Sequence, residues 1–264
     1  MIDKTFLETY VRQNGMPNRP RPVLAEYLQS EILDAVYTSK FGRSLSFMGG
    51  TALRFVHRIN RFSEDLDFEQ IREGLDVEEL SRFLEKRLHR LGFEVETRVK
   101  TTENIIIIFV KFSGTSPLLG EDVQSNQKFK VKIEIDPNPS KHIQYEAVPV
   151  SAFGKNMTLI ANTPETIFAQ KIIALAFRPY QKGRDFYDIA WFLIRRTIEP
   201  KYELLREKDI IASHRSEVAA FLSSCMERAD LEQTARDVER FLFRPEDSKW
   251  ILDLPKRIEE WEKQ

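Results

Sequence analysis

Two carboxylates, Asp65 and Asp67, stand two residues apart in an apolar stretch that predicts a short β-strand. Because side chains alternate along a strand, both carboxylates fall on one face, while Leu66 and Phe68 fall on the other. Two carboxylates held so close repel each other unless a cation lies between them, and hard oxygen ligands suit Mg²⁺. The spacing therefore predicts a Mg²⁺ site on this strand.

A glycine pair precedes the two acids. The short apolar segment from Leu45 to Met48 ends in Gly49 and Gly50, and we expect a helix to begin at Thr51. Glycine allows a sharp turn and lets a ligand approach the backbone N–H groups. The amides at the N-terminus of a helix favour an anion such as phosphate. Gly49, Gly50 and Thr51 are therefore predicted to bind the phosphates of a nucleotide beside the metal.

The order of these residues, Gly49 to Leu53 followed by Arg61 to Phe68, resembles the signature of the DNA polymerase beta-like nucleotidyltransferase superfamily. More narrowly, it resembles the AbiEii/AbiGii-type toxins of type IV toxin–antitoxin systems, which include the mycobacterial MenT toxins. The resemblance extends in pieces over residues 22–195 and implies an α+β fold, a mixed sheet flanked by helices. It also implies transfer of a nucleotide from an NTP. Gly-Gly-Thr in place of Gly-Ser, and a longer gap to Asp65, depart from the broad pattern and suit the toxin branch.

A second strand is predicted from Gln127 to Asp136, where apolar and charged residues alternate. Its charged face is either an ordinary solvated face or part of the site. The resemblance implies a third metal-binding acid on a later strand. We choose Asp136, at the end of the strand, and keep Glu134 as the alternative because the sequence leaves the register open.

Two predicted helices carry further candidates. Residues 163–177 begin with a capping threonine followed by proline and carry Lys171, which either extends to the surface or faces a polar cleft. Residues 185–194 form a strongly apolar helix that contains Asp188, and a pair with Arg184 would hold its start. The resemblance implies instead that Lys171 contacts nucleotide phosphate and that Asp188 belongs to the catalytic set. Arg184 is placed with the nucleotide-binding residues.

The remaining periodicities divide the chain into a mixed part and a helical part. We expect a nucleotidyltransferase domain over residues 1–162 and a C-terminal helical domain over residues 163–264 that closes the active-site cleft. The further predicted elements are helices at 22–40, 76–91, 202–208, 215–227, 231–243 and 250–261, strands at 93–99 and 105–110, and a short apolar piece at 157–161.

The composition is that of an ordinary globular protein. The 264 residues carry 40 basic and 41 acidic side chains, so a nucleic-acid site must be a local patch. The single cysteine, Cys225, excludes an intramolecular disulfide and fits a reducing compartment. Neither a signal peptide nor an apolar run long enough to cross a membrane is apparent, so we expect a cytoplasmic protein.

The acceptor of the nucleotide is the open question. The toxin resemblance implies the 3′ end of tRNA, and a separate antitoxin that does not bind the toxin stably. The basic residues near the motif either follow an RNA backbone or are exposed charges; they are Arg54, His57, Arg58 and Arg61. Two alternatives remain: transfer to a small molecule such as an antibiotic or to a protein hydroxyl, and a module that binds NTP without transfer.

Overall fold

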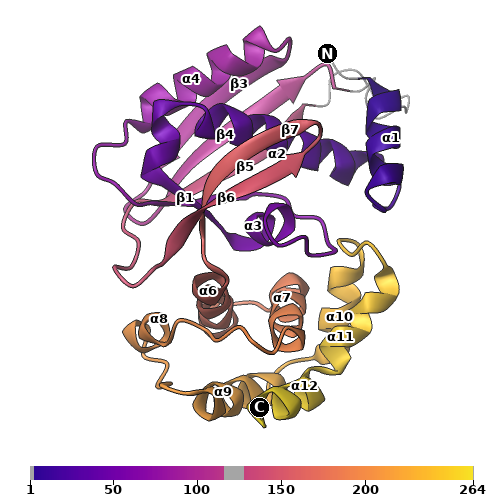
Figure 1. Cartoon of the computed structure of the whole chain (residues 1–264), viewed down its shortest axis with the longest axis vertical. Coiled ribbons are helices and arrows are strands. Elements are labelled where there is room, and N and C mark those ends of the chain that lie inside the picture. Colours follow the sequence, from indigo (N-terminus) through magenta and orange to yellow (C-terminus); the bar gives the residue numbers. More distant parts are fainter. Residues whose placement is uncertain (1–2, 116–127, 264) are drawn as a thin grey trace. The chain divides into compact units, whose positions relative to one another are not determined.

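The computed structural model describes residues 3–115 and 128–263. By their contacts, the residues divide into two compact units (Figure 1). Unit 1 takes in Met1–Arg58, Phe62–Pro139 and Ala147–Ala161, and unit 2 takes in Ile59–Arg61, Ser140–Glu146 and Asn162–Gln264. The main break therefore lies between residues 161 and 162. That the helical part closes an active-site cleft stays a prediction.

A mixed seven-stranded sheet runs through the described part of unit 1 (Figure 1). The strand order is β3-β4-β5-β2-β1-β7-β6. The bounds are β1 Leu45–Met48, β2 Leu66–Gln70, β3 Glu94–Thr101, β4 Ile106–Ser113, β5 Phe129–Asp136, β6 Tyr145–Ala152 and β7 Lys155–Asn162. β1 pairs antiparallel with β2 and parallel with β7, while β2 pairs parallel with β5. This mixed sheet confirms the predicted fold class.

The strands expected before the glycine pair, at the two acids and at residues 127–136 are all present. Residues 105–110 are apolar at every position, which is typical of a strand covered on both faces, but the residues of β4 alternate between buried and partly exposed, so only one face is fully covered. β6 was not predicted: Val148, Val150 and Ala152 alternate along it, but Pro149 in its interior argues against a strand.

The register of three neighbouring strands places the predicted acids. Met48, the last residue of β1, is the strand partner of Asp67. The glycine pair that follows Met48 therefore begins beside that acid. On the other side of β2, Asp67 is the partner of Glu134 on β5.

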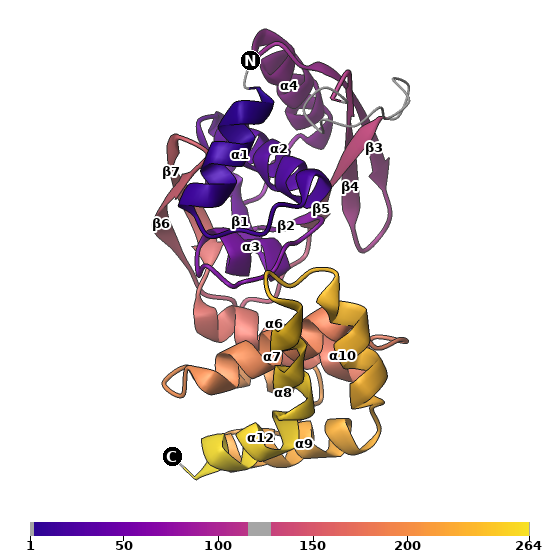
Figure 2. The ribbon, with the colours of Figure 1, turned by 90° about the vertical axis from the view of Figure 1, so that its right-hand side faces the viewer.

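In unit 1, α2 and α4 begin within two residues of the predicted positions, whereas α3 begins at Gly49 and not at Thr51 as predicted, because the glycine pair itself forms the first turn. Pro20 occupies the first turn of α2, and Asp76 caps α4 by accepting a hydrogen bond of 2.8 Å from the Glu79 N–H. α2 and α4 pack together, and α4 also packs on β3 (Figures 1 and 2). The bounds are α1 Lys4–Gln13, α2 Pro20–Tyr37, α3 Gly49–Phe55 and α4 Val77–Arg90, with a 3₁₀ turn at Lys40–Ser44.

Unit 2 is helical throughout its longer described segment, and α6 lies beside α7 (Figure 2). The bounds are α6 Pro164–Phe177, α7 Gly183–Ile194, α8 Tyr202–Glu207, α9 Arg215–Glu227, α10 Leu231–Glu239, α11 Lys249–Leu252 and α12 Leu254–Glu262, with a 3₁₀ turn at Pro245–Ser248. The single helix predicted over residues 250–261 is divided in two. Pro255 explains the division, because it has no N–H to donate and fits only the first turn of a new helix.

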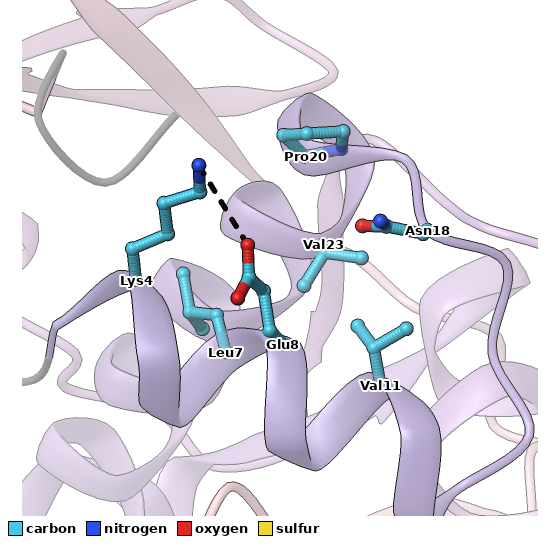
Figure 3. A pocket seen from close by; sticks show the side chains of 7 residues that line it. All are labelled: Lys4, Leu7, Glu8, Val11, Asn18, Pro20 and Val23. Atoms are coloured by element: carbon cyan, nitrogen blue, oxygen red, sulfur yellow. Dashed lines mark ion pairs between the residues drawn. The ribbon is translucent and has the colours of Figure 1, made fainter. Parts of the chain in front are cut away.

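A small hollow in unit 1 bears on where a ligand can bind. Between α1 and α2 lies a hollow of about 20 Å³, bordered by the Lys4–Glu8 ion pair (Figure 3). It has room for one water molecule and is too small for a nucleotide.

Within the described residues, no helix is both long and apolar enough to cross a membrane.

Gly49 occupies a position that only glycine fits. Its φ is 75°, a left-handed conformation that side chains disfavour. A Cβ atom built there would overlap the Asp67 carboxylate and would lie 3.1 Å from its Cγ. The absence of a side chain is therefore what allows the turn and the acid to lie together.

Replacing Gly49 with alanine should lower the free energy of unfolding by more than the about 1–2 kcal/mol expected for the backbone conformation alone. Gly74→Ala is the matched control: Gly74 has a φ of 82° and nothing within 4 Å of an added Cβ. Melting temperatures from calorimetry should fall further for Gly49→Ala than for Gly74→Ala. Equal shifts would contradict the overlap with Asp67.

Candidate active site

One face of the sheet in unit 1 gathers charged side chains from β2 and β5. We call Asp65, Asp67, Lys132 and Glu134 the carboxylate face. Lys132 Nζ lies 3.2 Å from Asp65 Oδ2 and 2.8 Å from Glu134 Oε1. The Asp65 and Glu134 side chains are 34% and 28% exposed, so a ligand can reach both from solvent.

The electrostatics of this face are those of crowded acids. Burial raises the pKa of Asp65, the neighbouring Glu134 and Glu64 raise it further, and Lys132 offsets only part of the rise. Burial by itself would lower the pKa of Lys132, but Glu134 and Asp65 more than compensate, so that pKa is raised. The carboxylates therefore favour a cation among them.

Polar side chains hold the backbone that leads into the two acids. Gln29, buried on α2, donates hydrogen bonds of 3.1 and 2.9 Å to the carbonyls of Ser63 and Glu64. The buried Thr51 hydroxyl donates to the carbonyl of Asp65. Because the Thr51 hydroxyl serves the backbone, what Thr51 can offer a phosphate is its N–H.

The register separates the two candidates for the third acid. Glu134 is the strand partner of Asp67, whereas Asp136 is the partner of the buried Glu69. Asp136 also accepts a hydrogen bond of 2.8 Å from the Asn138 N–H, which ties it to the turn after β5. The arrangement thus favours Glu134, the alternative, over Asp136, the first choice.

The donor set of the carboxylate face fits Mg²⁺ chemically, since it offers hard carboxylate oxygens. Lys132 supports that fit, because its ammonium group lies between Asp65 and Glu134, where a cation is stabilised. Among residues 3–115 and 128–263, no three Asp, Glu, His or Cys side chains converge closely enough to hold a metal. In this structure, Lys132 is thus the counterion that the two acids share.

A second group of charges lies inside unit 2. We call Arg61, Lys171, Asp185 and Asp188 the buried ion cluster. Arg61 Nε and Nη2 donate to the two oxygens of Asp188 over 2.6 and 2.7 Å. Lys171 Nζ lies 2.8 Å from Asp188 Oδ2 and 3.1 Å from Asp185 Oδ1.

The charges within this cluster compensate one another. Burial alone would raise the pKa of Asp188, which is fully buried, but Arg61 and Lys171 reverse the effect and lower it. Burial would likewise lower the pKa of Arg61, and Asp188 raises it instead. Asp188 is therefore a carboxylate whose two oxygens are both engaged by cations.

The structure places three predicted residues of unit 2 as follows. Lys171 is 8% exposed and faces acids, so it does not extend to the surface. The ion pairs found for Asp188 are with Arg61 and Lys171, and the Arg184 guanidinium lies 4.4 Å from the centre of the Phe241 ring. Whether Lys171 and Arg184 bind nucleotide, and whether Asp188 takes part in catalysis, stay predictions.

Two of the basic residues near the glycine motif correct the sequence interpretation. Arg54 and Arg61 are 6% and 1% exposed, and they pair with Glu26 and Asp188. Neither follows an RNA backbone nor is an exposed charge, so both interpretations are wrong for these two. Arg58 is exposed and donates a hydrogen bond of 2.8 Å to the Ser151 carbonyl.

Sequence reasoning missed the roles of Lys132, Arg61 and Asp185. Lys132 lies on the same strand face as Glu134, so the alternation over residues 127–136 contained its signal. Arg61 and Asp188 are 127 residues apart, and no local pattern joins them. Asp185 lies in the first turn of α7, and its pairs with Lys171 and Arg178 were not foreseen from the sequence.

Replacing Asp188 with asparagine should destabilise unit 2 by about 3–5 kcal/mol, because it leaves Arg61 and Lys171 buried without their shared acid. All three tryptophans, Trp191, Trp250 and Trp261, lie in unit 2. Urea unfolding followed by tryptophan fluorescence therefore reports on this unit.

The exposed Glu232 pairs with Arg236 on one turn of α10, and Glu232→Gln makes the same charge change at the surface. This control substitution should lower the free energy of unfolding by less than about 0.5 kcal/mol. If the Asp188 variant unfolded at the same urea concentration as the control, the cluster would not support the unit. Because the pKa of Asp188 is lowered on folding, its contribution is complete above the ordinary value of 3.8 and is lost as the pH falls below it.

Two solved structures are similar to this chain over most of its length. JHP933 from Helicobacter pylori matches with a TM-score of 0.60 and 18% identity, covering 93% of each chain. A presumed nucleotidyltransferase from H. pylori matches with a TM-score of 0.59 and 17% identity, covering 93% of this chain and 96% of its own. At these identities the likeness shows a common fold.

A search of curated proteins found no match. The model of one protein family, described as the nucleotidyl transferase AbiEii toxin of type IV toxin–antitoxin systems, matches residues 31–254. That span contains the glycine turn, the carboxylate face and the buried ion cluster. The chain therefore belongs to the AbiEii family of nucleotidyltransferase toxins.

Proposed function

We propose that this nucleotidyltransferase transfers NMP from an NTP to the 3′-terminal hydroxyl of tRNA, which blocks aminoacylation and halts translation. The observation that carries the proposal is the carboxylate face beside Gly49. There, three acids from two neighbouring strands adjoin a glycine turn, and the missing side chain of Gly49 lets the Asp67 carboxylate lie against that turn. The tRNA acceptor is supported by the resemblance to the MenT branch and by membership of the toxin family.

The reaction forms one P–O bond and breaks another. The acceptor hydroxyl attacks the α-phosphorus of the NTP, the bond to the β-phosphate oxygen breaks, and pyrophosphate leaves. The hydroxyl proton passes to a carboxylate of the site. When bound, Mg²⁺ supplies charge neutralisation for the triphosphate and makes the hydroxyl more acidic.

Asp65, Asp67 and Glu134 are the residues that would hold Mg²⁺, with Asp136 the less favoured third acid. The N–H groups of Gly49, Gly50 and Thr51 would bind phosphate oxygens. α3 spans only seven residues, so we assign its dipole a small part. Lys171 and Arg184 remain proposed nucleotide ligands on the strength of the resemblance.

An antitoxin partner follows from membership of a type IV toxin–antitoxin family. We propose that the antitoxin is a separate protein that does not form a stable complex with this chain. The reaction requires its substrates alone, so purified protein suffices for the tests below.

Asp65→Asn and Asp67→Asn should each lower nucleotide transfer about 10³-fold or more, because each removes a charge from the metal ligands. Purified protein is incubated with total tRNA, Mg²⁺ and each α-phosphate-labelled NTP in turn, and label in RNA and free pyrophosphate are both measured. Glu64→Gln is the control, since it removes one charge from an exposed neighbour in the same segment. It should retain activity near that of wild type.

The outcomes separate the proposal from its alternatives. If only wild type and the Glu64→Gln control label tRNA, the result supports the proposal and reveals the preferred NTP. Pyrophosphate without labelled RNA would move the acceptor to a protein or a small molecule. NTP binding with neither product would indicate a nucleotide sensor, and full transfer by either Asp variant would overturn the metal assignment.

Lys132 is expected to weaken Mg²⁺ binding in the absence of NTP. Because a bound Mg²⁺ ion must compete with the Lys132 ammonium for Asp65 and Glu134, Lys132→Met should tighten Mg²⁺ binding about tenfold. Titration calorimetry with Mg²⁺ measures this directly.

Lys130→Met is the matched control. Lys130 lies on the same face of β5, two residues away, and its ammonium group lies 4.7 Å from the centre of the Phe109 ring. The control should change Mg²⁺ affinity much less, since it alters only long-range charge. Equal effects of the two substitutions would show that Lys132 does not compete for the metal position.

A further inference from the structure

The connection between α6 and α7 carries two exposed aromatic side chains. We call residues 177–184 the aromatic-basic loop. Phe177 and Tyr180 are each 60% exposed. Of the large hydrophobic side chains that the structure describes, only Ile211, at 87%, is more exposed. Exposing two large aromatic rings to water costs free energy, and these rings do not contribute to packing in the core.

The charge of this loop is one-sided. Its sequence, Phe-Arg-Pro-Tyr-Gln-Lys-Gly-Arg, contains three cations and no acid. Lys182 Nζ lies 5.4 Å from the centre of the Tyr180 ring, so a cation and an aromatic face are presented together. The whole chain has a net charge of −1, which makes the loop a local exception.

The loop is anchored to the buried ion cluster. Arg178 pairs with Asp185, whose other oxygen lies 3.1 Å from Lys171 Nζ. At its far end the loop enters α7 at Gly183, where an added Cβ would lie 3.0 Å from the Val238 nitrogen of α10. Close packing at one end and an ion pair at the other fix where the two rings emerge.

We propose that the aromatic-basic loop is a stacking platform for unpaired bases of the acceptor RNA. Two exposed rings, one of them beside the Lys182 ammonium group, suit a ligand that has flat bases and a negative backbone. Stacking on a ring accepts any base, and the cations accept any phosphate, so the platform selects single-stranded RNA without reading its sequence. This inference rests on the proposed RNA acceptor.

The test measures RNA binding without turnover. A short single-stranded RNA carrying 2-aminopurine near its 3′ end is titrated with the full-length protein, and quenching of its fluorescence reports stacking. Phe177→Ala and Tyr180→Ala should each weaken binding roughly 5- to 150-fold and reduce the quenching. Tyr180→Phe keeps the ring and should retain both.

Ile211→Ala is the matched control, because it removes an exposed side chain of the same unit that has no ring. It should leave RNA affinity unchanged, and all variants should melt like wild type. Lys182→Gln should reduce the salt dependence of binding by about 0.7 in the slope of log K against log salt concentration. RNA affinity of Phe177→Ala and Tyr180→Ala equal to that of wild type would overturn the platform.

A fluorescent NTP analogue distinguishes the other ligand that a ring can stack. If Tyr180→Ala weakened binding of the analogue and left RNA affinity unchanged, the ring would serve the nucleotide and the proposal would be wrong. The proposed function fails separately. RNA binding that depends on Tyr180 supports the platform even if no nucleotide is transferred to RNA. If nucleotide is transferred to RNA and the Tyr180→Ala variant binds RNA as tightly as wild type, the proposed function stands and the platform is wrong.

Discussion

A carboxylate that is shielded from water requires a cation, and this requirement shapes both units of the protein. On the sheet, Lys132 lies between Asp65 and Glu134. Among the helices, Arg61 and Lys171 engage the two oxygens of Asp188. Such pairs cost much to break, because a single partner left behind is an uncompensated charge. Each unit thus holds its acids in fixed positions by electrostatics.

The two groups differ in how accessible they are, and the difference suggests different tasks. The carboxylate face is about one-third exposed at Asp65, and a single flexible lysine balances it. A divalent ion can therefore replace that lysine. Asp188 is fully buried, and a bidentate arginine holds it. We therefore regard Asp188 first as the residue that positions Lys171, and direct contact with nucleotide as a secondary role.

The proposed roles of unit 2 converge on Asp185. Its two oxygens engage Lys171 and Arg178, so it joins the proposed phosphate ligand to the aromatic-basic loop. A substitution at Asp185 is therefore expected to disturb both at once. The Arg178–Asp185 ion pair thus ties the loop to the cluster close to Phe177.

The sequence by itself determined the features that depend on near neighbours: the glycine turn, the two acids on one strand face, the capped helix at Thr163 and the family signature. These follow from periodicity of two or 3.6 residues and from capping chemistry, which act over a few residues.

Only the tertiary structure decided the rest. Strand register brought Glu134 rather than Asp136 opposite Asp67. Packing across 127 residues buried Arg61 against Asp188, where the sequence had suggested an RNA contact or an exposed charge. Both outcomes depend on which distant segments meet, because burial and pairing are set by the neighbours a side chain acquires and not by its own local pattern.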